Sequence, residues 1–267
     1  MIRDLRTAIG AGIVAVVAIA ALTAPWLSPH DPNIPDFAAA LAPPGASHWF
    51  GADDLGRDTF SRIVHGARAS LMVGFLSVAG ALILGTALGL TAGYFGGLAD
   101  TTIMRVMDVL FAFPGILLAL GITAALGPSL GNAILAIAVV NLPIFARLAR
   151  SQALVIRSLD YVEARRALGF GPVSILFSTV LPNAMGPIVV QASLLFASAI
   201  ITESYLSFLG LGVQPPTPTW GNMLRGAIGF LDMSAWLAWF PGIAIFATVL
   251  GFNLLGDGLR DRLDPRS

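Results

Sequence analysis

The chain has 267 residues, of which 56% are hydrophobic and 11% charged, whereas soluble domains average roughly 25% charged residues, so a water-soluble globule is excluded. The 15 acidic and 15 basic residues cancel, which excludes a nucleic-acid binder with a broad basic surface. All the basic residues are Arg and there is no Cys, so the chain has no Walker A lysine, no Schiff-base lysine and no thiolate chemistry. An integral membrane protein without evident catalytic chemistry remains.

Six stretches of the chain are long and apolar enough to cross a membrane as helices, because about 20 apolar residues span roughly 30 Å of hydrocarbon. They cover about residues 8–27, 70–94, 102–126, 130–148, 187–211 and 235–255. Small residues such as Gly80, Gly85 and Gly89 allow neighbouring helices to approach closely. The sequence therefore predicts an all-α integral membrane protein with six transmembrane helices.

The first apolar stretch also has features of a secretory signal peptide. Arg3 and Arg6 precede it, and Ala18-Ile19-Ala20 resembles a cleavage site. The apolar run continues to Leu27, so cleavage there would divide a hydrophobic segment. We therefore expect this stretch to remain as the first span.

The distribution of Arg predicts the orientation of the spans, since cytoplasmic segments of membrane proteins are enriched in positive charge. With the N-terminus inside, eleven of the 15 Arg lie in inner segments and four in outer ones. Both termini are therefore expected in the cytoplasm. Residues 30–69 and 212–234 are expected outside.

The segment between the fourth and fifth spans, about residues 149–185, is too long for a tight connection. Its first half has the alternation of apolar and polar residues typical of a helix, which Gly169 and Pro172 end. A second short amphipathic run, residues 173–181, is expected to end at Pro182. A helix–break–helix with one apolar face buries that face either on the membrane surface or in a groove of a partner protein. The residues alone leave both interpretations open.

Residues 163–169 have the sequence Glu-Ala-Arg-Arg-Ala-Leu-Gly, and Leu-Pro follows twelve residues after the Gly. This pattern resembles the EAA loop of bacterial ABC-importer permeases, which sits in a cleft of the cytoplasmic ATPase. Arg165 stands where the second Ala of that pattern is usual. The resemblance assigns ATPase coupling to Glu163, Ala164, Arg165, Arg166, Leu168, Gly169, Leu181 and Pro182.

Five further segments extend the resemblance over nearly the whole chain. They are residues 50–58, 66–71, 206–212, 215–222 and 256–261. All are similar to segments of the C-type subunit in the dipeptide, oligopeptide and nickel permease family. The resemblance implies the type I ABC-importer permease fold, with a first helix and extracytoplasmic loop over residues 1–68, a permease domain over 69–257 and a cytoplasmic tail over 258–267.

The resemblance also implies a function and partners. The chain is expected to be the channel-forming permease of an importer in the bacterial cytoplasmic (inner) membrane, with no catalytic residue, metal or cofactor of its own. Its expected partners are a homologous B-type permease, two ATP-binding subunits or one fused ATPase, an extracytoplasmic substrate-binding protein and membrane lipid, but no nucleic acid. The family carries dipeptides, oligopeptides, nickel chelates, glutathione and haem, and selection among them lies largely with the binding protein.

Two other classes of function compete with this one. An ion-gradient-driven secondary transporter or channel would show inverted repeats and several intramembrane charges, whereas the sequence shows no clear repeat and few such charges. An intramembrane protease would need a metal-binding motif or a catalytic pair of acids, and neither is present. Co-purification of an ATPase separates the importer from both.

Two acidic residues lie in or beside the predicted spans, where an unpaired charge is costly. Asp108 follows Arg105 by three residues, so we expect a local ion pair. Glu203 has no basic residue within a helical turn. Both are candidates for a translocation path or an interhelix contact, and a purely structural hydrogen bond is the alternative for Glu203.

Two expectations concern polar residues outside the spans. Glu163 is expected to pair with Arg166, three residues on, in the free subunit. His30, His48 and His65 all fall in the predicted outer loop at spacings that match no zinc motif. Solvated histidines rather than a metal site are therefore expected.

Overall fold

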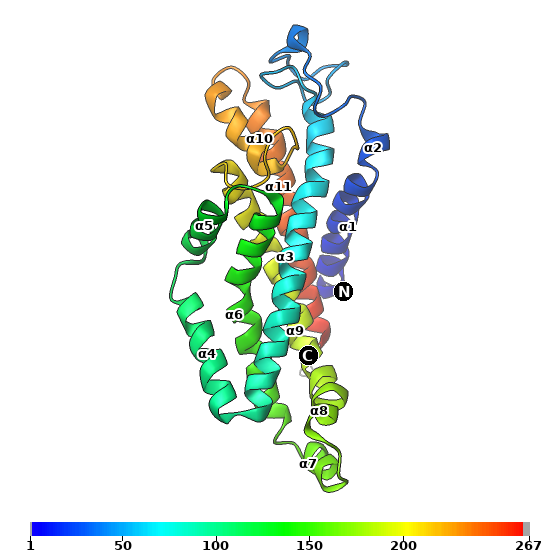
Figure 1. Ribbon diagram of the computed structural model, residues 1–267. Coiled ribbons are helices and arrows are strands. Elements are labelled where there is room, and N and C mark those ends of the chain that lie inside the picture. Colours follow the sequence, from blue (N-terminus) through cyan, green and yellow to red (C-terminus); the bar gives the residue numbers. More distant parts are fainter. Residues whose placement is uncertain (1, 264–267) are drawn as a thin grey trace.

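The computed structural model describes residues 2–263, which form an elongated bundle of helices (Figure 1). The helices are α1 (Ile2–Leu22), α2 (Ala24–Leu27), α3 (Thr59–Phe95), α4 (Gly97–Phe111), α5 (Gly115–Leu126), α6 (Leu130–Ile156), α7 (Asp160–Ala167), α8 (Pro172–Ile175), α9 (Leu181–Phe208), α10 (Trp220–Ala227) and α11 (Trp236–Leu263). A π-helical turn, Leu176–Val180, joins α8 to α9. The loop before α3 lies at one end of the bundle and α7 at the other (Figure 1).

Among the described residues, five helical stretches are long and apolar enough to cross a membrane, and a bent pair of helices supplies a sixth. The bent pair is α4 and α5, whose axes differ by 90°. The predicted third span is therefore placed correctly, but its expected continuity is wrong. Pro114 explains the break, because a proline disfavours helical backbone at the residue before it and lacks the N–H that a continuing helix needs.

The predicted loop of residues 149–185 is shorter in the structure, which corrects its expected boundaries. Helix α6 continues to Ile156, and one helical stretch runs from Pro172 to Phe208. The amphipathic run therefore does not end at Pro182. That proline lies in the first turn of α9. The π-helical turn before it connects α8 to α9 without a break in the helix. Only residues 157–171 lie between the two long helices.

The expected domain boundaries fall inside helices. The boundary at 68/69 lies within α3, and the one at 257/258 lies within α11. The expected tail is helical as far as Leu263, and residues 264–267 lie outside the described part of the chain.

Close contact between α3 and α6 forms the centre of the bundle. A methyl group added at Gly85 would lie 2.7 Å from the Cβ of Phe145, and one at Gly89 would collide with the backbone of Ala146. Glycines four residues apart thus let the two backbones touch, as small residues do in membrane helix pairs. At Gly80, the third glycine singled out in the sequence, a methyl group would have its first contact at 3.8 Å.

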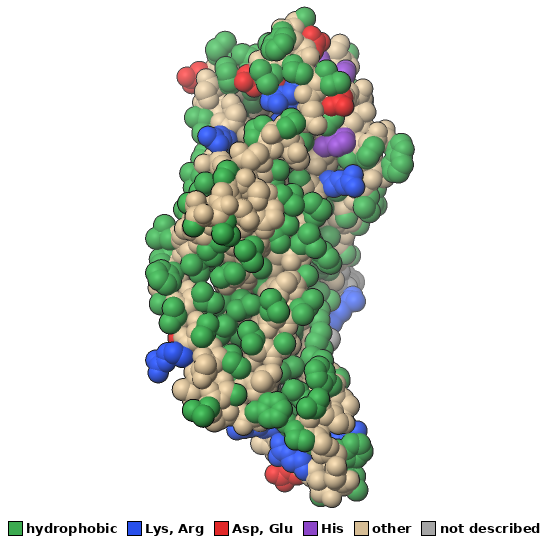
Figure 2. Space-filling view, in the orientation of Figure 1, with side chains coloured by type: hydrophobic (Ala, Val, Ile, Leu, Met, Phe, Trp, Pro, Cys, Tyr) green, Lys and Arg blue, Asp and Glu red, His purple; other side chains and the backbone are tan. Residues whose placement is uncertain are grey.

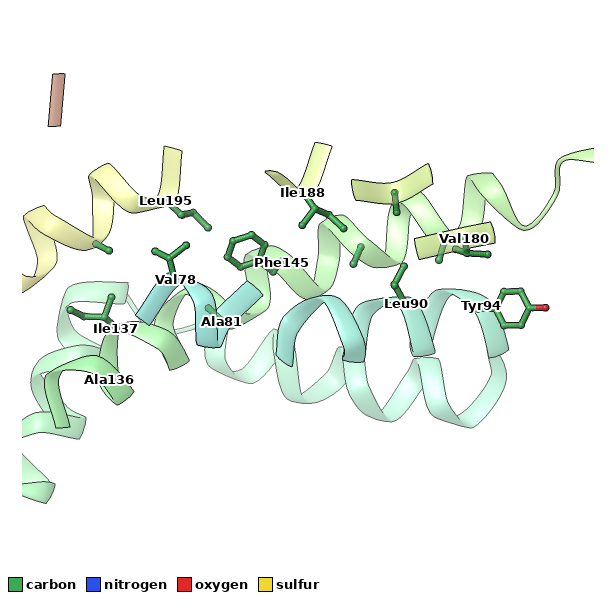
Figure 3. Close-up of a cluster of buried hydrophobic side chains, with 14 of the residues drawn as sticks. Val78, Ala81, Leu90, Tyr94, Ala136, Ile137, Phe145, Val180, Ile188 and Leu195 are labelled. Atoms are coloured by element: carbon green, nitrogen blue, oxygen red, sulfur yellow. The ribbon is translucent and has the colours of Figure 1, made fainter. Parts of the chain in front are cut away.

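The apolar core fills the space between α3, α6 and α9. Figure 3 shows Val78 of α3 close to Phe145 of α6 and to Leu195 of α9, and Leu90 of α3 close to Val180 of the π-helical turn. These side chains are almost fully buried. The three helices therefore form one packing unit.

The outside of the bundle is also apolar, which fits a protein surrounded by lipid. Figure 2 shows hydrophobic side chains over the middle of the visible face and charged ones mainly towards its two ends. Phe75 and Ile83 of α3 and Phe246 of α11 are more than 60% exposed. A surface of this kind is stable in hydrocarbon and not in water.

Candidate functional site: the α7 segment and the polar residues of the bundle

Helix α7 carries the residues that the sequence assigned to ATPase coupling. Its first turn contains Asp160 and Glu163 and its last turn Arg165 and Arg166, so each pair of charges complements the adjacent end of the helix dipole. Val162 is fully buried and belongs to the main apolar cluster. One residue thus anchors this short helix to the bundle, while the rest of it lies beyond the end of the long helices (Figure 1).

Gly169 ends the helix in a Schellman motif. The N–H of Gly169 donates to the carbonyl of Arg166 at 3.0 Å, and the N–H of Phe170 donates to the carbonyl of Arg165 at 3.1 Å. The φ angle of Gly169 is +84°, a conformation that side chains rarely adopt. A methyl group there would meet nothing within 4 Å in this chain. The glycine is therefore required by the backbone conformation and not by crowding within the subunit.

Arg165 fixes the α7 segment to the helix that follows it. Its guanidinium donates to Ser178 at 2.8 Å and also to Thr179, both on the π-helical turn, and lies 4.5 Å from the ring centre of Phe170. Arg165, which departs from the family pattern at this position, thus ties the α7 segment to the helix that follows it. This role could not be predicted from the sequence, because the partners of Arg165 lie 13 and 14 positions away.

Glu163 makes no ion pair in the described structure, so the expected pair with Arg166 is wrong. The Arg166 guanidinium instead lies 5.6 Å from the ring centre of Tyr94 on α3. Glu163, Ala164 and Leu168 are exposed, Leu168 by 76%. These side chains form a free face on α7.

Leu181 and Pro182 lie apart from this face. They occupy the first turn of α9, after α8 and the π-helical turn. Leu181 packs against the main apolar cluster, whereas Pro182 is exposed. The structure therefore groups the first six assigned residues on and just after α7 and places the last two on a neighbouring helix.

Glu203 is fully buried at the junction of three helices. Its carboxylate accepts hydrogen bonds from Ser70 of α3 at 3.0 Å and from Ser207 of α9 at 2.7 Å. A third partner is the side chain of Thr219, the residue that caps α10. Glu203 therefore makes an interhelix contact by hydrogen bonds to hydroxyl groups, with no basic residue in the set.

Asp108 pairs with Arg147 of α6, not with Arg105, which corrects the expected local pair. The Arg147 Nη2 atom lies 2.8 Å from the Asp108 carboxylate. One turn further along α6, Arg150 binds Asp100 with two hydrogen bonds of 2.5 and 2.7 Å. The partner of Asp108 was not visible in the sequence because it lies 39 positions away.

These two ion pairs line a charged pocket of about 550 Å³ between α4 and α6, together with Arg105. Arg147 lies roughly 26 Å along α6 from its first residue, about the thickness of the hydrocarbon core. The pocket therefore lies near the end of the membrane-spanning region closest to α7, where charged side chains can reach the membrane interface.

The histidines are not all solvated. The side chain of His30 is 44% exposed, but that of His48 is only 12% exposed and lies 2.9 Å from the fully buried Asp58 carboxylate. The expectation of a solvated side chain is therefore wrong for His48. Sequence spacing gave no signal of this contact, because the loop folds back onto the start of α3.

The fold and these sites define a multi-pass helical membrane protein with a short, mostly exposed helix, α7, at one end. Residues 85–267 match the family described as "Binding-protein-dependent transport system inner membrane component", and the chain belongs to this family. It is thus a permease subunit of an ABC importer, whose ATPase is a separate partner. The ion-gradient-driven alternative is not favoured.

Three relatives show how much of the chain the family covers. The chain is 49% identical to the dipeptide transport system permease protein DppC of Alkalihalophilus pseudofirmus, over 97% of this chain and 85% of that protein. It is 48% identical to the glutathione transport system permease protein GsiD of Pectobacterium atrosepticum, over 98% and 87%. It is 44% identical to the probable D,D-dipeptide transport system permease protein DdpC of Escherichia coli, over 98% and 88%.

A solved structure supports the fold. An inward-facing structure of the MetNI methionine ABC transporter matches with a TM-score of 0.63 at 19% identity, over 77% of this chain and 97% of that one. The type I importer permease architecture predicted from the sequence is therefore confirmed.

Proposed function

We propose that this chain imports peptides through a path that it forms with a second permease, driven by an ATPase bound to α7. The observation that carries the proposal is the free face of α7, where Glu163, Ala164 and Leu168 are exposed beyond the end of the bundle. A short helix held by one buried side chain and an Arg165 clamp is suited to entering a groove of a partner protein. Residues 69–257 are the unit proposed to carry out transport.

The peptide class of substrate rests on the relatives and on the charged pocket. Relatives over nearly the whole chain are named as dipeptide and D,D-dipeptide permeases. The half-exposed Asp108–Arg147 pair offers one negative and one positive group near the α7 end of the membrane-spanning region, which suits the two charged termini of a peptide. We propose that this pair lines the path and that Glu203 fixes the helices around it.

The proposed orientation places α7 and both termini in the cytoplasm and residues 30–69 outside. The support is the bias of Arg towards one side, together with the position of α7 at the end opposite the long loop (Figure 1). The proposed partners follow from it: a homologous B-type permease beside the bundle, two ATP-binding subunits or one fused ATPase at α7, and a substrate-binding protein at the loop.

Reconstitution in lipid vesicles tests the proposal. The purified subunits, the ATPase and the substrate-binding protein are assembled, and uptake of a labelled dipeptide is measured together with ATP hydrolysis. Uptake that requires both ATP and the binding protein is the expected result. ATP hydrolysis stimulated by a loaded binding protein, without accumulation of any di- or oligopeptide, would overturn the substrate class but not the coupling role of α7.

A further inference from the structure

Two histidines and a carboxylate converge at the start of α3, where the preceding loop folds back onto the bundle. The Nδ1 atom of His48 lies 2.9 Å and that of His30 lies 3.8 Å from the Oδ1 atom of Asp58. One ligand atom from each of the three residues lies within 4.8 Å of the others. The two imidazole rings have centres 4.9 Å apart and are tilted by 31°. Three nitrogen and oxygen donors thus face one small volume.

The surroundings of this cluster hold the carboxylate in place. The second oxygen of Asp58, Oδ2, accepts from the N–H of Ser61 at 2.8 Å and from its hydroxyl at 2.7 Å. These bonds cap α3 and leave Oδ1 free to face the histidines. Ordered second-sphere hydrogen bonds of this kind are typical of carboxylates that bind metal ions.

The same elements hold the segment that carries His30. The N–H of His30 donates to the Ser61 hydroxyl at 3.3 Å, and Arg62 donates to the carbonyl of Pro32 at 2.8 Å. Ser61 and Arg62 are almost fully buried. Two consecutive residues of α3 therefore fix the backbone on which His30 sits, so that its half-exposed ring remains beside Asp58.

The spacing of the donors fits a tetrahedral ion. Two ligands at about 2.0–2.1 Å from Zn²⁺ are about 3.3 Å apart in tetrahedral geometry, and the observed separations of 2.9 and 3.8 Å lie on either side of that value. The three donor atoms lie within 4.8 Å of one another, so binding one ion requires the half-exposed His30 ring to move towards the other two ligands. Two imidazoles and one carboxylate suit Zn²⁺ and related divalent transition-metal ions, with water as the fourth ligand.

We propose that His30, His48 and Asp58 form a binding site for a divalent transition-metal ion of the zinc class. The ion would tie two points of the loop before α3 to Asp58, the residue that caps that helix. Its expected effect is to stiffen the loop. The site is independent of α7 and of the charged pocket between α4 and α6.

Metal binding by the full chain in lipid nanodiscs tests the proposal. The protein is purified with an affinity tag that contains no histidine, treated with a chelator and titrated with Zn²⁺ alone. Calorimetry gives the affinity and the stoichiometry, and elemental analysis of the dialysed protein checks the bound metal. The visible spectrum of the Co²⁺-loaded protein reports whether the site is tetrahedral.

The chain contains three histidines, which supplies a matched control. We expect one Zn²⁺ per chain in the wild type and in His65→Gln, because His65 is not part of the cluster. We expect affinity at least about tenfold weaker in both His30→Gln and His48→Gln, since each removes one ligand. Asp58→Asn keeps an oxygen that can cap α3 while removing the charge, and it is expected to weaken binding as well.

Folding is checked separately from binding. The unfolding temperature of each variant without metal identifies any variant that has lost its fold, and Zn²⁺ is expected to raise the unfolding temperature of the wild type and of His65→Gln only. Absence of Zn²⁺ binding in the wild type would overturn the proposal. So would unchanged binding in folded His30→Gln and His48→Gln, or equal loss in His65→Gln.

Discussion

The carboxylate of Glu203 on α9 accepts a hydrogen bond from Ser70 on α3 at 3.0 Å, across 133 positions of the chain. Ser207 donates to the other carboxylate oxygen at 2.7 Å, and Thr219 adds the cap of α10 to the same group. One buried acid thus joins three helices, and the joint lies at the end of the bundle opposite α7.

Replacing Glu203 by Leu is expected to destabilise the protein. The change leaves the hydroxyl groups of Ser70 and Ser207 buried without their acceptor, and each such group costs about 1–3 kcal/mol. A clear decrease in the unfolding temperature of the assembled complex in nanodiscs is the expected result. Glu203→Gln, which keeps one acceptor oxygen, should lose less. Equal unfolding temperatures for the wild type and Glu203→Leu would contradict this role.

Replacing Gly89 by Ala tests the close contact between α3 and α6. The added methyl group collides with the backbone of Ala146, so the two helices must separate. Overpacking of this kind costs about 1–3 kcal/mol. Gly80→Ala is the matched control, because its methyl group would have its first neighbour at 3.8 Å. Thermal unfolding of both variants should show a loss for Gly89→Ala alone, and equal losses would exclude helix contact as the cause.

Replacing Gly169 by Ala should impair coupling to the ATPase. The positive φ of this residue costs an alanine about 1–2 kcal/mol, so the end of α7 is displaced from its present path. Hydrolysis stimulated by the loaded binding protein is expected to fall roughly tenfold, while the activity of the isolated ATPase is unchanged.

Two other substitutions show whether the backbone conformation at residue 169 or the bulk of an added side chain impairs coupling. Asn tolerates positive φ, so Gly169→Asn should retain most of the stimulated hydrolysis. Gly171 has a φ of −69° and open space around it, so Gly171→Ala should behave like the wild type. If Gly169→Trp also couples fully in reconstituted vesicles, α7 does not dock on the ATPase.

Replacing Glu163 by Ala should separate stability from coupling. Glu163 has no ion pair in the described structure and is exposed, so loss of its interaction with the helix dipole should lower the unfolding temperature of the subunit by no more than about 3 °C. Stimulated ATP hydrolysis should fall, because the charge belongs to the free face of α7. Arg165→Ala is the contrasting variant and should lower both quantities, since it also breaks the clamp to Ser178. Unchanged hydrolysis in Glu163→Ala would remove this residue from the docking face.

The orientation can be tested directly because the chain contains no Cys. A single Cys is introduced at Phe37 or at Leu168, which are 73% and 76% exposed. An impermeant thiol reagent applied to intact cells should label Phe37→Cys and not Leu168→Cys, and permeabilised cells should label both. The reverse pattern would place α7 outside and overturn the proposed topology.

The sequence predicted the number and placement of the spans because long apolar stretches are a direct consequence of bilayer thickness. It did not predict which proline breaks a helix. Pro143 and Pro187 lie inside α6 and α9, whereas α4 and α5 separate at Pro114. A proline removes one backbone hydrogen-bond donor at all three positions, and packing by neighbouring helices decides whether the helix continues or breaks there.

Side-chain partners were the second part that sequence reasoning missed. Local spacing suggested partners within one helical turn for Asp108 and Glu163, but Asp108 binds a residue of another helix and Glu163 binds none in the described structure. Periodicity along one helix carries no information about a neighbouring one. The same limit hid the approach of His48 to Asp58, which depends on the path of a loop.

The unbroken helical stretch from Pro172 to Phe208 has a mechanical consequence. Its 37 residues make a rod about 55 Å long. Arg165 donates a hydrogen bond to Ser178 in the first turns of this rod. In its last turns, Glu203 accepts hydrogen bonds from α3 and from the cap of α10. A tilt of about 5° about the end near Arg165 would displace the far end by roughly 5 Å, more than the 3.8 Å between successive Cα atoms. Such a displacement exceeds what the 3.0 Å hydrogen bond from Ser70 to Glu203 allows, so a tilt of the rod would have to carry α3 and the cap of α10 with it.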